Sequence, residues 1–180
     1  STLLPMSLLL QRERIPSAYG GAVFNILPQM RNRMPGYFLG EKVDGAISTV
    51  EQLLTTPPPM PTYELASRTF KVALDHFRSR QASIEAKVWQ IISDGDEVHN
   101  YLKNANKDLG QNIVAALTFG DMDLLSTNLE WVQGLLVNYH YRMPEKMMLT
   151  YMEAYYEACK AYLDERGAPI VDWLEELLNV

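Results

Sequence analysis

From residue 62 onward, apolar residues recur every three or four positions, which is the spacing of one face of an α-helix. Thr62 is suited to cap a first helix that begins at Tyr63. A second helix follows, and "SDGDE" (93–97) interrupts it with the spacing of a capping box. The expected core positions are Ala66, Phe70, Ala73, Leu74 and Phe77 in the first helix and Ile84, Val88, Ile91, Val98 and Leu102 in the second.

Three further helices and a short closing helix follow. "KDLGQNIVAALTF" is expected to end at Gly120 as a C-cap, and a fourth helix runs from Asp121 or Asp123 through Tyr139. A fifth begins at Pro144 and stops at Gly167, and "PIVDWLEELL" closes the chain segment. The fourth helix carries an apolar arc bordered by Trp131. The fifth carries a stripe of Met148, Tyr151, Met152, Tyr155, Cys159 and Tyr162.

Before residue 62 the pattern is broken by prolines and glycines. "AYGGAVFNILPQM", "RMPGYFLG" and "GEKVDGAISTVEQLL" predict short helices, and strand signals are nearly absent. "TTPPPMP" forces extended backbone. The expected organisation is an N-terminal helical section (1–54), a Pro-rich connector (55–61) and a main helical bundle (62–180). Together these make one all-α domain, with the N-terminal arm docking on the core or on a partner chain.

Composition and charge remove several classes of function. The chain of 180 residues has a net charge of −6 and an estimated pI of 5.1, which argues against a nucleic-acid surface. Its arginine pairs are expected on solvated helix faces. The one cysteine excludes an internal disulfide and a cysteine-based zinc site, and it fits a cytoplasmic location. The apolar N-terminal run is shorter than the roughly 18 residues that span a bilayer, so no membrane association is expected.

Neither metal chemistry nor catalysis is indicated. His76 and His99 fall on or beside apolar faces, where a hydrogen-bonded core residue and a ligand are the alternatives. His140 lies at the edge of the apolar arc near a helix C-terminus, where the helix dipole favours it. A di-iron bundle needs two Glu-x-x-His pairs, and the chain offers only Asp96-x-x-His99. No hydrolase motif occurs, so no enzymatic function is expected.

The aromatic and methionine stripe leaves two interpretations open. It is either core packing or one wall of a cleft for a planar conjugated ligand, since these side chains give polarizable contact area.

The segment 106–163 resembles the C-terminal half of phycobiliproteins, which are globin-like proteins that bind linear tetrapyrroles. The likeness rests on "DLG" opening a helix at Asp108, the helix end at Gly120, the Met122-Asp123 pair and Pro144. The same order of a helix, Gly-Asp, a second helix, a proline and a third helix is similar to the helical domain that precedes the cobalamin-binding domain of some light sensors. A stand-alone globin-like protein associated with bilin biosynthesis accommodates both likenesses. The resemblance implies a globin-like or phycobiliprotein-like bundle.

The resemblance also implies a ligand site. Asp108 would hold the pyrrole nitrogens, and Lys107 would meet a propionate in place of an arginine. Trp131 and His140 would wall the cleft, and His99 is a further candidate ligand-binding residue. The position of the bilin-attaching cysteine is Ala105 here, so the pigment would be held noncovalently. The sensor likeness departs at Tyr139, which stands where a glutamate precedes the histidine.

Two functions are therefore expected as alternatives. The first is a non-enzymatic protein that binds or hands over a bilin noncovalently. The second is a ligand-free helical module for regulation or protein interaction. In either case the partners would be a bilin-pathway or regulatory protein and a second copy of the chain.

Overall fold

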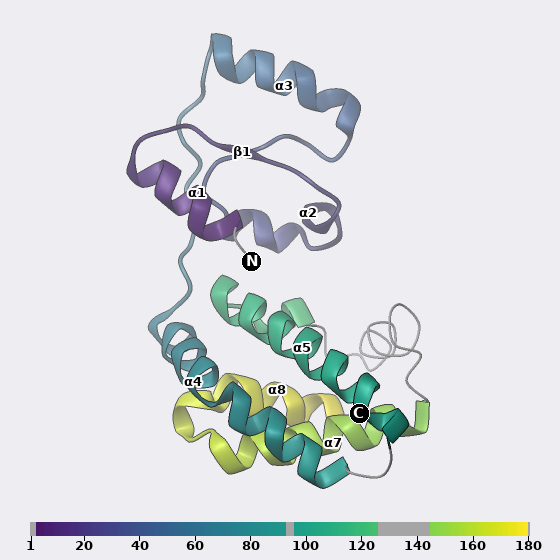
Figure 1. The fold of residues 1–180 in the computed structure, drawn as a ribbon. Helices are drawn as coiled ribbons and strands as arrows, with labels where there is room; N and C mark the ends of the chain where they lie inside the picture. The colour runs from purple at the N-terminus through teal and green to yellow at the C-terminus, as the bar shows by residue number, and fades with distance from the viewer. Residues whose placement is uncertain (1–2, 93–95, 126–144, 180) are drawn as a thin grey trace. The chain divides into compact units, whose positions relative to one another are not determined.

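The computed structural model describes residues 3–92, 96–125 and 145–179, and this part of the chain is mostly helical (Figure 1). The all-α expectation is confirmed at that level. The chain divides into two compact units, Ser1–Leu65 and Ala66–Val180. They are called the N-terminal unit and the C-terminal unit below, and each is described by itself.

The N-terminal unit combines short helices with two very short strands. In chain order its elements are α1 (Leu3–Arg12), β1 (Ala18–Tyr19), α2 (Val23–Ile26), the 3-10 helix η1 (Pro28–Arg33), β2 (Tyr37–Phe38) and α3 (Val43–Thr55). The strands pair in parallel, with Ala18 opposite Tyr37 and Tyr19 opposite Phe38. The sequence predicted short helices in the segments that contain these strands, and at β1 and β2 that prediction was wrong. Gly36, at φ +116°, brings β2 so close to Ser17 that a Cβ would lie 2.6 Å from its carbonyl oxygen.

An aromatic cluster with one arginine holds this unit together. The Tyr19 ring lies 4.7 Å from that of Phe24 and 5.8 Å from that of Phe38. The Arg31 guanidinium stacks on Phe38 at 4.1 Å, and its Nε donates to the Phe24 carbonyl at 2.9 Å. Its Nη2 also donates to Glu41 at 3.2 Å. Arg31 therefore has a structural role, whereas the sequence predicted that its side chain would lie on a solvated helix face.

The Pro-rich stretch is bonded back onto the N-terminal unit. Tyr37 donates its hydroxyl hydrogen to the carbonyl of Pro58 at 2.7 Å. The backbone N–H of Glu64 donates to the Asn32 carbonyl at 2.8 Å, and the Glu64 carboxylate lies 3.5 Å from Arg33. These bonds hold residues 57–67 outside any helix.

The C-terminal unit is a layered helical bundle. Its described elements are α4 (Arg68–Ile92), α5 (Asp96–Phe119), the 3-10 helix η2 (Met122–Leu125), α7 (Glu145–Tyr162), the 3-10 helix η4 (Glu165–Gly167) and α8 (Ala168–Leu178). α4 packs against both α5 and α7, and α8 packs against α7 and α4 (Figure 1). The expected fourth helix falls largely on 126–144, outside the described residues.

Helix α4 differs from the prediction at both ends. It begins at Arg68 rather than Tyr63, and the Ser67 hydroxyl accepts the Phe70 N–H at 3.5 Å in the role expected of Thr62. It then runs for 25 residues, so the two predicted helices are one up to Ile92. The bonds of Glu64 to Asn32 and Arg33, within the N-terminal unit, explain the later start.

Most predicted core positions are buried. On α4, Ala73, Phe77, Ile84 and Val88 are fully buried, and α7 buries every member of its stripe except Tyr162, which is 39% exposed. Ile91 is 45% exposed, and Ala66, Phe70 and Leu74 are only partly buried. The side chain of Val98 lies outside the described residues. Tyr162 and Ile91 both lie at the ends of their helices.

The sequence predicted that glycines end two of the helices, and the structure confirms this for one of them. α5 ends at Gly120 as predicted: at φ +76° its N–H bonds to the Ala116 carbonyl, which also accepts the Asp121 N–H. The helix predicted to reach Gly167 ends at Tyr162 instead. Asp164 then caps η4 by accepting the N–H of Arg166.

Gly120→Ala is expected to destabilise the C-terminal unit by about 1–3 kcal/mol, because an L-residue is strained at a positive φ. The added Cβ would also lie 2.8 Å from Ala66. All three tryptophans of the chain (89, 131 and 173) lie in this unit, so tryptophan fluorescence during urea unfolding measures the change. The double variant Ala66→Gly/Gly120→Ala is expected to recover only the part of the loss that comes from the Ala66 methyl. An unchanged midpoint for Gly120→Ala would contradict the strain argument.

Candidate functional site

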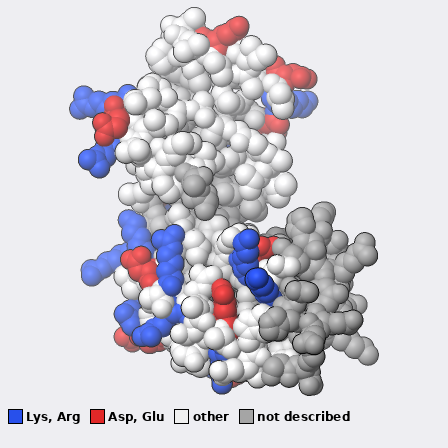
Figure 2. Space-filling view, viewed as in Figure 1, with Lys and Arg blue, Asp and Glu red and all other residues white. Residues whose placement is uncertain are grey.

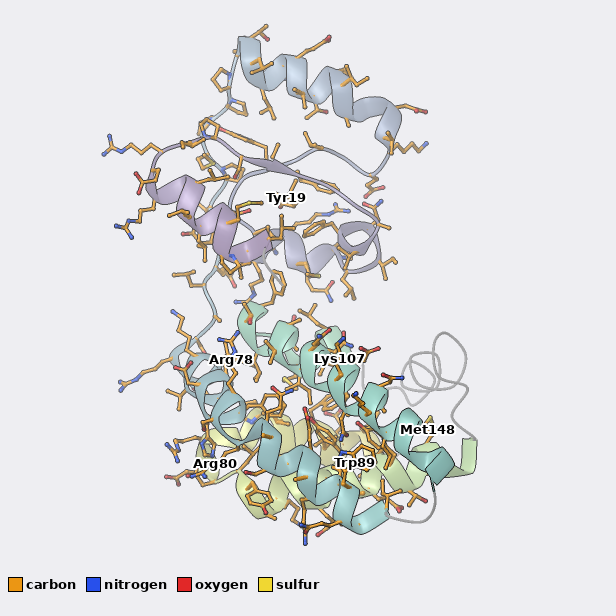
Figure 3. The ribbon with its side chains drawn as sticks, viewed as in Figure 1. Tyr19, Arg78, Arg80, Trp89, Lys107 and Met148 are labelled. Atoms are coloured by element: carbon orange, nitrogen blue, oxygen red, sulfur yellow. The ribbon has the colours of Figure 1, made fainter. Side chains whose placement is uncertain are left out.

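The two polar residues at the start of the family-like segment lie on α5 but point in different directions. Asp108 is partly buried, and its backbone carbonyl accepts the Asn112 side-chain N–H at 2.9 Å. Lys107 is exposed on α5 (Figure 3). Neighbouring residues on a helix diverge by about 100°, so the two side chains project to different sides of α5.

The other predicted ligand residues cannot be placed beside Asp108. Trp131 and His140 lie outside the described residues, and of His99 only the backbone, in α5, is described. The predicted bilin site therefore stays a prediction.

Next to Asp108 the described structure has a buried polar centre that the sequence did not predict. Tyr151 on α7 donates its hydroxyl hydrogen to Asn106 Oδ1 on α5 at 3.0 Å. Both side chains are almost completely buried. Two other buried polar atoms, Asn106 Nδ2 and the Tyr155 hydroxyl oxygen, have no hydrogen-bond partner within the described part of the chain. The tyrosine rings are 5.9 Å apart.

α4 contributes a glutamine and a glutamate near this centre. Gln81 Nε2 donates to Glu85 Oε1 at 2.8 Å. Gly110 on α5 makes room for this pair, since a Cβ there would lie 2.6 Å from the Gln81 amide nitrogen. The centre is thus built by α4, α5 and α7 together.

The electrostatics of the centre keep its phenols neutral. Burial raises the pKa of Tyr151 well above its usual value, and the charge of Glu85 raises it further. Asp108 acts on Tyr151 in the same sense. Burial likewise raises the pKa of Tyr155. These hydroxyls can donate hydrogen bonds, but neither is suited to act as a base or nucleophile at neutral pH.

The cysteine and the described histidine have structural environments. Cys159 is fully buried beside the tyrosines, and this burial raises the pKa of its thiol. His76 is also buried, and its Nε2 accepts the Asp164 N–H at 3.3 Å. Hydrogen bonds from Arg166 lower the pKa of Asp164, so its carboxylate is ionised beside the imidazole. A ligand and a hydrogen-bonded core residue were the two alternatives for His76, and the structure shows a hydrogen-bonded core residue.

Neither a metal site nor a membrane span is found among the described residues. No group of three or more His, Cys, Asp and Glu side chains is placed to hold a metal ion there. None of the helices in that part of the chain is long and apolar enough to cross a bilayer. On the face in Figure 2, acidic and basic side chains are interspersed on the described surface.

Described residues line two cavities, one in each unit. One, of about 300 Å³ in the N-terminal unit, is bounded by Gly20–Ala22, Asn25, Leu39–Val43 and Ala46. The other, of about 260 Å³, lies where α7 meets η4 and α8 and is lined by residues that include Lys160 and Asp172. Neither cavity is lined by Asp108 or Lys107.

The N-terminal unit also presents an uncovered apolar surface. No residue of α3 is buried, although the helix is amphipathic. Val43, Ile47, Val50 and Leu54 are its exposed apolar residues. Single exposed apolar side chains are ordinary, but a row of four on one helix is typical of an interaction surface.

Tyr151→Phe is expected to destabilise the C-terminal unit by about 1–3 kcal/mol, because it leaves the buried amide of Asn106 without its bond. Tyr155→Phe is the matched control. It removes a hydroxyl that has no partner among the described residues, so the unfolding midpoint should stay the same or rise. Tryptophan fluorescence in urea compares the two variants. Equal losses would show that the Tyr151–Asn106 bond contributes nothing specific.

Cys159 is expected to react with a maleimide or a disulfide reagent at pH 8 only when the C-terminal unit unfolds. The reactive species is the thiolate, and burial both raises the thiol pKa and blocks access. The labelling rate should therefore follow urea unfolding measured by fluorescence. Rapid labelling of the native protein would contradict the described burial.

A comparison with protein families, with curated proteins and with solved structures found no match to this chain.

Proposed function

We propose that the C-terminal unit binds a linear tetrapyrrole noncovalently and that the protein is a binding or carrier protein rather than an enzyme. The observation that carries the proposal is the position of Asp108. Its carboxylate lies at the edge of the buried face of α5 and is close enough to act on the hydroxyl of Tyr151. A partly desolvated carboxylate beside apolar surface is suited to accept hydrogen bonds from pyrrole N–H groups.

Cysteine chemistry supports noncovalent rather than covalent binding. The position that carries the attaching cysteine in phycobiliproteins is Ala105, and it is buried in the core. Cys159 is fully buried and its thiol pKa is raised, so it is unsuited to form a thioether with a pigment. Lys107 is exposed and free to turn toward a propionate at the rim.

The test is titration of the full chain with biliverdin and with phycocyanobilin, followed by absorbance and induced circular dichroism. The native protein is expected to shift both signals at micromolar concentration, which corresponds to about 8 kcal/mol of binding free energy. Asp108→Asn should weaken binding about tenfold or more, because it removes the charge that pairs with the pyrrole nitrogens. Lys107→Ala should cost only a few-fold, as expected for an exposed ion pair.

Asp172→Asn is the matched control, since Asp172 is an exposed carboxylate on α8. It should bind the pigments like the native protein. If neither pigment changes its spectrum, or if Asp108→Asn binds as well as the native chain, the bilin proposal is wrong.

The second candidate function is a ligand-free module for protein interaction or regulation. The uncovered apolar face of α3 favours it, because such a row is suited to contact another protein. The bilin proposal and this one concern different units of the chain, so each can fail alone.

A further inference from the structure

Helix α3 carries a continuous exposed apolar stripe. Val43 is 86% exposed, Ile47 71%, Val50 38% and Leu54 79%. Their spacing of four, three and four residues is the a/d spacing of a helix that packs along another helix. At about 100° per residue the four positions fall within about 60° around the axis. They form one seam, called the α3 stripe below.

The two sides of the α3 stripe differ. Ala46, Thr49 and Leu53 are the partly buried residues of α3, and they lie about 90° to one side of the stripe. Asp44 and Glu51 lie about 90° to the other side, one heptad apart and exposed. Neither carboxylate has an ion-pair partner among the described residues. The stripe therefore has an acidic edge whose charges are uncompensated.

The stripe continues into a hollow at its N-terminal end. Val43 and Ala46 also line the cavity of about 300 Å³ described above. An apolar side chain from a docked helix can enter this cavity while the rest of that helix follows Ile47, Val50 and Leu54. An anchor in a pocket beside a flatter seam is the usual arrangement at a helix-binding surface.

The acidic edge argues against a second copy of α3 as the occupant. In an antiparallel pair, Asp44 and Glu51 of one copy would face Glu51 and Asp44 of the other, and like charges would repel. In a parallel pair, the same carboxylates would face Ala46 and Leu53, which offer them no cation. An anionic membrane is disfavoured for the same reason, because α3 itself contains no Lys or Arg.

We propose that the α3 stripe docks an amphipathic helix of a partner protein whose apolar residues have heptad spacing and whose flank toward Asp44 and Glu51 is basic. Charge complementarity at the edge sets the orientation of that helix, and the seam supplies the apolar contact. α3 has 13 residues and is therefore about 20 Å long, so one docked helix buries less than the roughly 1,200 Å² of a stable standard interface. The complex is reversible.

The experiment uses the full chain and two labelled three-heptad peptides with Ile and Leu at a and d. One peptide has Lys at e and g, and the other has Glu there. Fluorescence anisotropy is expected to show binding of the basic peptide at least about tenfold tighter than that of the acidic one. Raising the salt concentration should weaken the basic complex.

Two pairs of variants separate apolar docking from unspecific attraction between a basic peptide and an acidic protein. Ile47→Ser/Leu54→Ser should weaken binding about tenfold or more, and Met6→Ser/Leu9→Ser, which alters exposed apolar residues of α1, should change it less than about twofold. Asp44→Asn/Glu51→Gln should weaken binding several-fold and reduce its salt dependence. The control for charge is Asp172→Asn/Glu176→Gln on α8, which should have no effect. Far-ultraviolet circular dichroism checks that each variant keeps the native helix content.

Three results would overturn the proposal. The first is binding of the basic peptide that survives Ile47→Ser/Leu54→Ser unchanged, which would show attraction by net charge alone. The second is a dimer in analytical ultracentrifugation that the same variant dissociates, which would make a second copy the occupant. The third is co-flotation with phosphatidylglycerol vesicles that this variant abolishes, which would make a membrane the occupant. Absence of peptide binding to the native chain refutes it directly, whatever the bilin titration shows.

Discussion

The hydrogen bond from Tyr151 to Asn106 is the constraint on which the C-terminal unit depends. It joins α7 to α5 inside a mostly apolar core, where a polar group without a partner is costly. A shift of either helix by one residue would separate the two atoms and bury both. Gln81 and Glu85 extend this requirement to α4, because Gly110 must stay opposite them. Apolar packing alone tolerates small displacements, whereas this set of polar contacts selects one arrangement of three helices.

Much of the bundle could be predicted from the sequence, because the apolar residues that recur at helical spacing there are also the buried ones. The α7 stripe from Met148 to Cys159 is buried as its spacing indicates, and Gly120 ends α5 because only glycine adopts its backbone angles without strain. Asn106 could have been found by the same reasoning, since it falls on the α5 face between Leu102 and Ile113. An asparagine at an apolar position signals a buried partner, but the sequence does not say which residue that partner is.

The N-terminal unit was harder to predict because its contacts are not periodic. β1 and β2 have two residues each, which is too short for an alternating pattern. Helix α3 was expected as a helix, yet its period does not reveal that the partly buried side is that of Ala46 and Leu53, and not that of Val43 and Leu54. The start of α4 depends on Glu64, whose bond to Asn32 pairs residues far apart in the chain. The candidate bilin site was predictable only through a resemblance, and of its five residues the structure describes the side chains of only Asp108 and Lys107.

The bonds of Tyr37 to Pro58 and of Glu64 to Asn32 give the triple proline a role different from that of a spacer. Prolines lose little conformational entropy on folding, because their backbone is already restricted in the unfolded chain. The segment is fixed at Pro58, the middle proline, and again at Glu64, so the stiff prolines stand at one of its two anchored points. Replacing Pro57–Pro59 with flexible residues would then loosen the bond of Tyr37 to Pro58. The stiffness of the segment thus contributes to the folding of residues 1–65.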